Sequence, residues 1–223
     1  MAIINIKKFK NSVQSGVTLI ELIVVIVIFS IISSVLLFNY SDFSTNVSIR
    51  NLSQDIALTV RKVQTYATSV QSINNSGVDT RTFPSYGISF SLDDTSGSFD
   101  PNKKRFVVFA DIPSTSDSLP NKLYDNNGVC GSPAVDSECL ESFTINSSDT
   151  IVEVCTDVTG CVAVGSVDIT FRRPVPDAII CYKETLDADC QTSSISYVDI
   201  VLRSAKGLTR KVSVWNTGQI SVK

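Results

Sequence analysis

One acidic residue lies inside an otherwise apolar stretch near the N-terminus of this 223-residue chain. Residues 17–38 are mostly Ile, Val, Leu and Phe, and Glu21 is the fifth of them. At about 1.5 Å of rise per residue, a helix of this length spans a bilayer core of roughly 30 Å. An ionised carboxylate inside that core costs at least about 2.5 kcal/mol if it has no partner. The stretch therefore predicts a membrane helix, and Glu21 is the residue that a simple anchor does not explain.

The segment before the apolar stretch is basic. Lys7, Lys8 and Lys10 precede it and no acid does, which predicts that the N-terminus stays in the cytoplasm. Two simpler interpretations remain open. A secretory signal peptide also has a basic start and an apolar core, but its core is shorter and should contain no Glu. An ordinary single-pass anchor explains the length and the lysines, yet leaves Glu21 without a partner.

These residues together resemble the class III signal of type IV pilins and type II secretion pseudopilins. The matching residues are Lys7, Lys8, Lys10, Gly16, the run 18–22 and the apolar residues up to Phe38. The resemblance implies that prepilin peptidase cleaves between Gly16 and Val17 and methylates the amine of Val17. It also implies that Glu21 pairs with the N-terminus of a neighbouring subunit. Val17 departs from the family pattern, in which Phe or Met usually begins the mature chain.

Composition limits the chemistry of the chain. The net charge is −3, so loss of the three leader lysines gives about −6, which argues against general binding of nucleic acid or anionic membranes by the soluble part. The chain has no His, which excludes histidine acid–base catalysis and histidine metal sites. It also lacks a phosphate-binding glycine loop. We therefore expect no enzyme activity and no cofactor.

All cysteines follow the apolar stretch: Cys130, Cys139, Cys155, Cys161, Cys181 and Cys190. An even number in an exported domain favours disulfides. Six cysteines allow 15 pairings, and the sequence suggests the local set 130–139, 155–161 and 181–190. A zinc site is the competing interpretation, but the chain has no Cys-x-x-Cys pair.

The helical pattern continues past the apolar stretch, and the sequence then changes to strands. Apolar residues recur on one helical face of segment 39–76: Leu52, Ile56, Val60, Val63, Ala67 and Val70. We expect one helix from residue 17 to about residue 72. Beyond Gly77, alternating runs such as 86–90, 167–171 and 198–202 predict strands, and residues 210–222 predict a hairpin. The predicted fold is α+β: a long N-terminal helix, spanning the membrane and then amphipathic, packed on a mainly antiparallel β domain of residues 77–223.

The middle of the chain, residues 93–190, is acidic, and its turn-rich segments, such as 114–118 and 126–137, are predicted to be surface loops in a solvated region held by disulfides. A calcium loop is a weaker hypothesis. Oxygen-bearing side chains alternate around Gly97 but lack the closing Glu of an EF-hand loop: Asp93, Asp94, Ser96, Ser98, Asp100 and Asn102.

The C-terminal segment reverses the charge. Residues 201–223 contain no acid and five basic residues: Arg203, Lys206, Arg210, Lys211 and Lys223. Some FimT-like minor pilins capture DNA through a basic C-terminal region, and Trp215 and Tyr197 lie nearby for stacking. The plainer interpretation is a basic sheet edge that discourages aggregation or docks on a neighbour.

We expect a structural subunit, of the minor class, in a type IV pilus or type II secretion pseudopilus. Among such proteins the chain is most similar to the GspH/FimT type, on helix 50–70, Tyr86-Gly87-Ile88 and the C-terminal hairpin. The resemblance implies the inner membrane as location, with a periplasmic or extracellular domain. It implies other pilins, the peptidase, a platform protein and an assembly ATPase as partners. A DNA-capturing pilin and an anchored protein that never polymerises are the alternatives.

Overall fold

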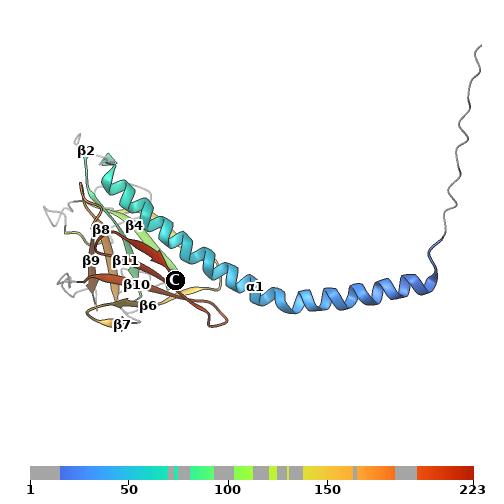
Figure 1. The fold of residues 1–223 in the computed structure, drawn as a ribbon. Helices are drawn as coiled ribbons and strands as arrows, with labels where there is room; N and C mark the ends of the chain where they lie inside the picture. The colour runs from blue at the N-terminus through green and yellow to red at the C-terminus, as the bar shows by residue number, and fades with distance from the viewer. Residues whose placement is uncertain are drawn as a thin grey trace, which may run out of the picture. The chain divides into compact units, whose positions relative to one another are not determined.

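The computed structural model describes residues 16–69, 73–74, 81–92, 103–112, 121–124, 130, 138–162, 165–183 and 195–223. The chain divides into two compact units, Met1–Phe43 and Ser44–Lys223. A single helix, α1 (Leu19–Thr68), begins in the first unit and ends in the second. Figure 1 shows the strands of the second unit beside the C-terminal part of this helix.

Helix α1 confirms the predicted long helix but is shorter at its C-terminal end. It ends at Thr68, whereas the sequence predicted about residue 72 and an amphipathic helix over 39–76. The hydroxyls of Thr65, Thr68 and Ser69 donate to carbonyls of the preceding turn, and side chains that bond the backbone in this way favour helix ends. Beyond them, β1 (Ile73–Asn74) pairs with β2 (Arg81–Thr82). The predicted helical residue Val70 lies outside the described residues.

Besides the β1–β2 pair, the strands of the second unit form two five-stranded sheets, and every pairing is antiparallel. The first sheet has the order β5-β4-β3-β8-β9, with β3 (Ser85–Ser91), β4 (Arg105–Asp111), β5 (Cys139–Thr144), β8 (Ser166–Phe171) and β9 (Ala178–Lys183). The second has the order β12-β11-β10-β6-β7, with β6 (Thr150–Thr156), β7 (Gly160–Val162), β10 (Tyr197–Arg203), β11 (Thr209–Trp215) and β12 (Ile220–Val222). Its two edge strands, β7 and β12, have three residues each.

One hydrophobic core joins the helix to both sheets. The expected face of α1 is buried in it, with Ile56, Val60 and Val63 fully inside. They pack with inward side chains from both sheets, such as Ile88 and Val212. This arrangement confirms the α+β fold with a helix packed on antiparallel sheets.

Gln64 is a polar residue of the helix that is nevertheless buried. Its Nε2 donates to the carbonyl oxygens of Pro176 at 2.9 Å and Gly218 at 3.1 Å. Those carbonyls lie in the β8–β9 connection and the β11–β12 turn. The side chain therefore ties the helix to both sheets, and burial of its amide is compensated by hydrogen bonds.

A second layer covers the outer face of the first sheet. Val107 and Phe109 of β4 point away from the main core and pack with Tyr124 and Cys139. The Tyr124 N–H donates to Asp168, and the Thr170 hydroxyl donates to the carbonyl of Lys122. Strand β4 is therefore covered on both faces, which is typical of a strand with a continuous apolar run such as residues 106–110.

The described parts of the middle of the chain contain paired strands, whereas the predicted loop segments 114–118 and 131–137 lie outside the described residues. Strands β5, β6, β7 and β9 lie within residues 93–190 and pair in register with β4, β10 and β8. Ile151 and Val154 of β6 are buried in the core. Acids such as Glu141 and Glu153 break the hydrophobic alternation, but they lie on half-exposed positions of paired strands. Acidic residues in this region therefore also occur on the half-exposed faces of paired strands.

Candidate functional site

Thr18 caps the N-terminus of α1. Its side-chain oxygen accepts a hydrogen bond from the Glu21 N–H at 3.3 Å, and the Leu22 N–H donates to its carbonyl at 3.2 Å. The spacing from Thr18 to Glu21 is that of a capping box, which fixes where a helix begins. Glu21 consequently lies in the first turn, where the positive end of the helix dipole favours a carboxylate.

Gly16 lies two residues before this cap, in a position where the fold does not require glycine. A Cβ at residue 16 would meet no heavy atom within 4 Å. The contrast with Gly87 is clear, because a Cβ there would overlap the ring of Phe109. Any requirement for glycine at residue 16 therefore comes from a molecule that binds this segment.

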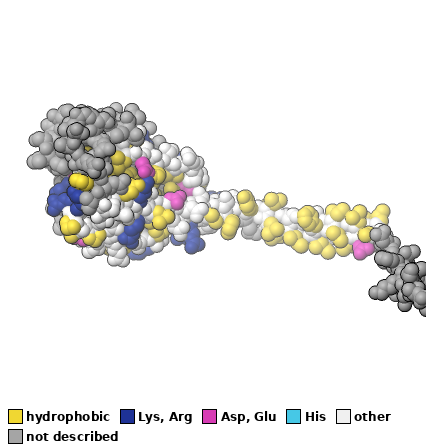
Figure 2. All heavy atoms as spheres, turned by 90° about the horizontal axis from the view of Figure 1, so that it is seen from above, with side chains coloured by type: hydrophobic (Ala, Val, Ile, Leu, Met, Phe, Trp, Pro, Cys, Tyr) yellow, Lys and Arg dark blue, Asp and Glu magenta, His cyan; other side chains and the backbone are white. Residues whose placement is uncertain are grey.

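The apolar stretch that follows is exposed along its whole length. Phe38 is 82 % exposed, and no residue of its most apolar 18-residue window is buried. Figure 2 shows hydrophobic side chains covering this part of the helix. By length and composition it can cross a membrane. Ser30 fits such an environment, because its hydroxyl donates to the Ile26 carbonyl at 2.8 Å.

Among the described residues of the stretch, 16–38, Glu21 is the one ionisable side chain, and it is exposed. The sequence predicted cleavage at Gly16 and Val17, methylation of Val17 and charge pairing by Glu21. In the structure Gly16 and Val17 lie just before the helix, which begins at Leu19, and Glu21 lies in its first turn; Val17 is itself exposed. The leader residues Lys7, Lys8 and Lys10 lie outside the described residues.

Two of the three predicted disulfides are present, Cys130–Cys139 and Cys155–Cys161. Cys181 is also disulfide-bonded, and its expected partner Cys190 lies outside the described residues. Cys155 and Cys161 are directly opposite each other in the β6–β7 pair.

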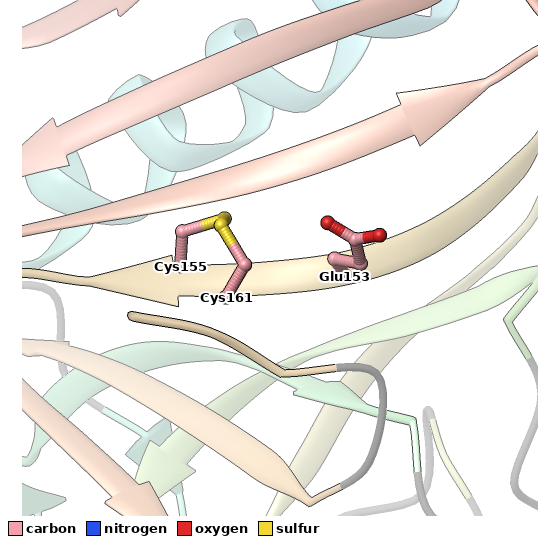
Figure 3. Close-up of side chains that lie close together, drawn as sticks. All are labelled: Glu153, Cys155 and Cys161. Carbon is pink, nitrogen blue, oxygen red and sulfur yellow. A yellow bond between two sulfur atoms is a disulfide. The ribbon is translucent and has the colours of Figure 1, made fainter. Parts of the chain in front are cut away.

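Glu153 lies beside the Cys155–Cys161 disulfide, and the three side chains together have the composition of a metal-binding cluster (Figure 3). The two sulfurs are bonded to each other, however, so neither is a thiolate that could bind zinc. The cluster is therefore a disulfide beside a carboxylate. The candidate calcium ligands Asp93, Asp94, Ser96, Ser98, Asp100 and Asn102 all lie outside the described residues.

The basic residues proposed for DNA contact do not share one face. Along β11, Arg210 and Lys211 point to opposite faces of the sheet, and the Lys211 Nζ lies 3.5 Å from Asp199 Oδ2. The Lys223 ammonium lies 5.7 Å from the centre of the Trp215 ring, over the surface that a base would need for stacking. Arg203 and Lys206 lie together at the β10–β11 connection. Capture of DNA stays a prediction.

Thr18 and Gln64 are the structural residues whose roles sequence reasoning did not identify. Thr18 was recognised as part of a motif, and the T-x-x-E spacing was the available signal for its capping role. Nothing in the sequence distinguishes Gln64 from a solvent-facing polar residue, because its partners lie more than 110 positions away.

Comparison with known proteins adds one finding. No curated protein and no solved structure matches the chain. Residues 11–37 match the family model described as the prokaryotic N-terminal methylation motif. That match covers the end of the leader, Gly16, the capped helix start and most of the apolar stretch. The N-terminal segment therefore has the prokaryotic N-terminal methylation motif, followed by a helix that is long and apolar enough to cross a membrane.

Proposed function

We propose that this protein is a structural subunit, of the minor class, in a type IV pilus or type II secretion pseudopilus filament. Prepilin peptidase cuts between Gly16 and Val17 on the cytoplasmic face of the bacterial inner membrane and methylates the amine of Val17. The β domain lies on the periplasmic or extracellular side. A platform protein and an assembly ATPase then drive extraction of the subunit into the filament.

The exposed apolar surface of residues 17–38 is the observation that carries this proposal. Apolar surface left in water costs about 25 cal/mol per Å² compared with burial. The surface therefore requires lipid while the subunit is stored and the helices of other copies once it is assembled. A stretch that is apolar on all sides suits both environments, because lipid tails and packed helices are equally apolar.

Glu21 distinguishes assembly from passive anchoring. Cleavage after Gly16 creates an α-amine at Val17, so the mature apolar stretch has one cation and one anion. Thr18 caps the helix and Glu21 is exposed on its first turn, which leaves the carboxylate available to another copy. Pairing in trans compensates both charges in an apolar filament core, where an unpaired charge is costly.

The GspH/FimT subtype is supported by the layout of the second unit. The helix packs on antiparallel sheets, and the chain ends in the predicted β11–β12 hairpin, in which Trp215 N–H donates to Gln219 and Gly218 N–H donates to Trp215. The subtype remains part of the proposal.

The test compares Glu21→Ala with Asp177→Ala, which removes an exposed acid from the β domain. Both variants should be cut after Gly16, so that intact mass gives a chain starting at Val17. Removing one partner of a buried ion pair costs about 3–5 kcal/mol, so Glu21→Ala should be largely lost from sheared filaments while Asp177→Ala is retained.

Two outcomes would contradict the proposal. An uncut chain would indicate a plain anchor, and a start beyond residue 33 would indicate a secretory signal peptide. Equal recovery of both variants in filaments, with the subunit away from the filament tip, would show that Glu21 does not pair in trans.

A further inference from the structure

Four segments meet at one end of the second unit: residues 44–51, 103–104, 145–151 and 203–210. We name this region the basal end. Ser48 of α1 donates to Asp149, and the Ile151 N–H donates to the carbonyl of Lys103 at 2.7 Å. Thr150 is paired in register with Arg203, which brings the β10–β11 hairpin to the same place. These contacts hold the four segments together within one unit.

The basal end is strongly basic although the chain as a whole is acidic. Its four segments contain six basic residues: Arg50, Lys103, Lys104, Arg203, Lys206 and Arg210. Their one acid is Asp149, which is fully buried and accepts hydrogen bonds from Ser48 and Ser147. Within these four segments the exposed charges are therefore positive, while the exposed Asp42 lies two residues before the first of them. The net charge of −3 for the whole chain does not reveal this local concentration of basic residues.

The β10–β11 hairpin gives the basal end a fixed tip. The Ser204 N–H donates to the Leu208 carbonyl at 2.8 Å, and the Leu208 N–H donates to the Ser204 hydroxyl at 3.0 Å. Gly207 has a φ of 82°, a conformation that glycine adopts without strain. The turn presents exposed Lys206 beside Leu208, which is 39 % exposed. A cation next to an apolar side chain suits the boundary between lipid headgroups and acyl chains.

The chain connects the basal end directly to the apolar stretch. Ser48 is ten residues beyond Phe38, which corresponds to about 15 Å of helix. Lys and Arg side chains extend several ångströms further, and charges attract across about 8–10 Å at moderate salt. The basal end is therefore joined to the anchor by about three turns of helix.

We propose that the basal end binds anionic lipid headgroups while the subunit is anchored, with Arg203, Lys206 and Lys103 contacting the lipid phosphates and Leu208 entering the interface. This interaction rests on the membrane-anchored state and is independent of filament assembly. It would hold the β domain against the bilayer until extraction separates the basic surface from lipid.

The test uses the full chain in vesicles of phosphatidylcholine, with or without phosphatidylglycerol. Trp215 is the one tryptophan, so the double variant Leu208→Trp/Trp215→Phe places a single reporter on the hairpin. Phosphatidylglycerol should shift its emission to the blue and increase quenching by brominated lipid. Each basic residue near a surface changes partitioning by about fivefold, so Lys103→Gln/Arg203→Gln/Lys206→Gln should abolish the difference between the two vesicles.

Arg172→Gln is the matched control for Lys206→Gln in the reporter background. Arg172 is exposed and directly follows β8. It lies four residues before Pro176, whose carbonyl accepts a hydrogen bond from Gln64 near the C-terminal end of α1. The basal end instead includes residues 44–51 of the same helix. The control should leave the phosphatidylglycerol response unchanged. Equal quenching in both vesicles, or equal loss with Arg172→Gln and Lys206→Gln, would overturn the proposal. A larger emission shift with duplex DNA in neutral vesicles than with phosphatidylglycerol would show a nucleic-acid surface instead. None of these readouts depends on filament incorporation.

Discussion

The two parts of α1 differ in how far their apolar side chains are buried. Up to Phe43, apolar side chains are exposed on every side of the helix, as shown by Ile26 at 55 %. From Ser44 onward most of them lie on one face, where Ile56 is completely buried against the sheets, and Leu58 at 67 % is the main exposed exception. The hydrogen-bonding backbone is the same in both, so the difference lies in what must cover the side chains. The first part needs an external apolar environment, whereas the second carries its own in the β domain.

The sharpest test of this comparison pairs Ile56→Ala with Ile26→Ala in detergent. Loss of the fully buried Ile56 side chain should destabilise the β domain by about 2–5 kcal/mol, because it leaves a cavity in the core. Ile26→Ala should leave its stability unchanged. Chemical unfolding followed by near-ultraviolet circular dichroism measures both. Similar losses in the two variants would show that the units are energetically coupled.

A pH titration extends the comparison to polar groups within the β domain. Burial raises the pKa of Tyr124 from 10.0 to about 12. The unfolded chain therefore loses this proton first, so the free energy of unfolding falls as pH rises from 10 to 12 and levels off above. The contribution is about 2–3 kcal/mol, and Tyr124→Phe should lack it.

Lys62 and Tyr86, whose pKa values are also raised, titrate in both proteins and cancel in the difference between them. The measurement is unfolding by urea at a series of pH values. Parallel declines for wild type and Tyr124→Phe would contradict burial of the Tyr124 hydroxyl in the folded state.

The smallest expected difference in stability is between alanine substitutions at two glycines, Gly87 and Gly16. A methyl group at Gly87 would overlap the Phe109 ring and lie 3.1 Å from the Ile169 carbonyl oxygen, so Gly87→Ala should cost about 1–3 kcal/mol. Gly16→Ala meets open space and should leave the melting temperature of the β domain unchanged. A bulkier residue at position 16 should block processing without altering that temperature. A large stability loss at residue 16 would mean that the leader packs on the fold.

Much of this fold could be predicted from local patterns. The uniform apolar run, the four- and three-residue steps from Leu52 to Ala67, and the alternation in β3, β8 and β10 each report which side chains are covered. The start of the candidate site was equally visible, because Gly16, Thr18 and Glu21 are close in sequence.

The rest depends on contacts between distant residues. Strands β5 and β6 contain Glu141 and Glu153, and their assignment requires knowing the partner strands that leave those positions half-exposed. The outer layer formed by Tyr124 has no periodic signal, because it is one short segment bound to Asp168. The basal end combines residues from four segments, so no window of sequence contains it.

The short edge strands of the second sheet have a consequence for crowding. In the proposed function, subunits stored in a membrane diffuse in two dimensions, where neighbours collide often and a long open strand would let sheets fuse. Strands β7 and β12 offer only three residues each, and the Cys155–Cys161 bond holds β7 on its partner. Very short edge strands are poor templates for another chain. The second sheet therefore offers little open edge at which two copies could fuse, whereas the edges of the first sheet, β5 and β9, have six residues each.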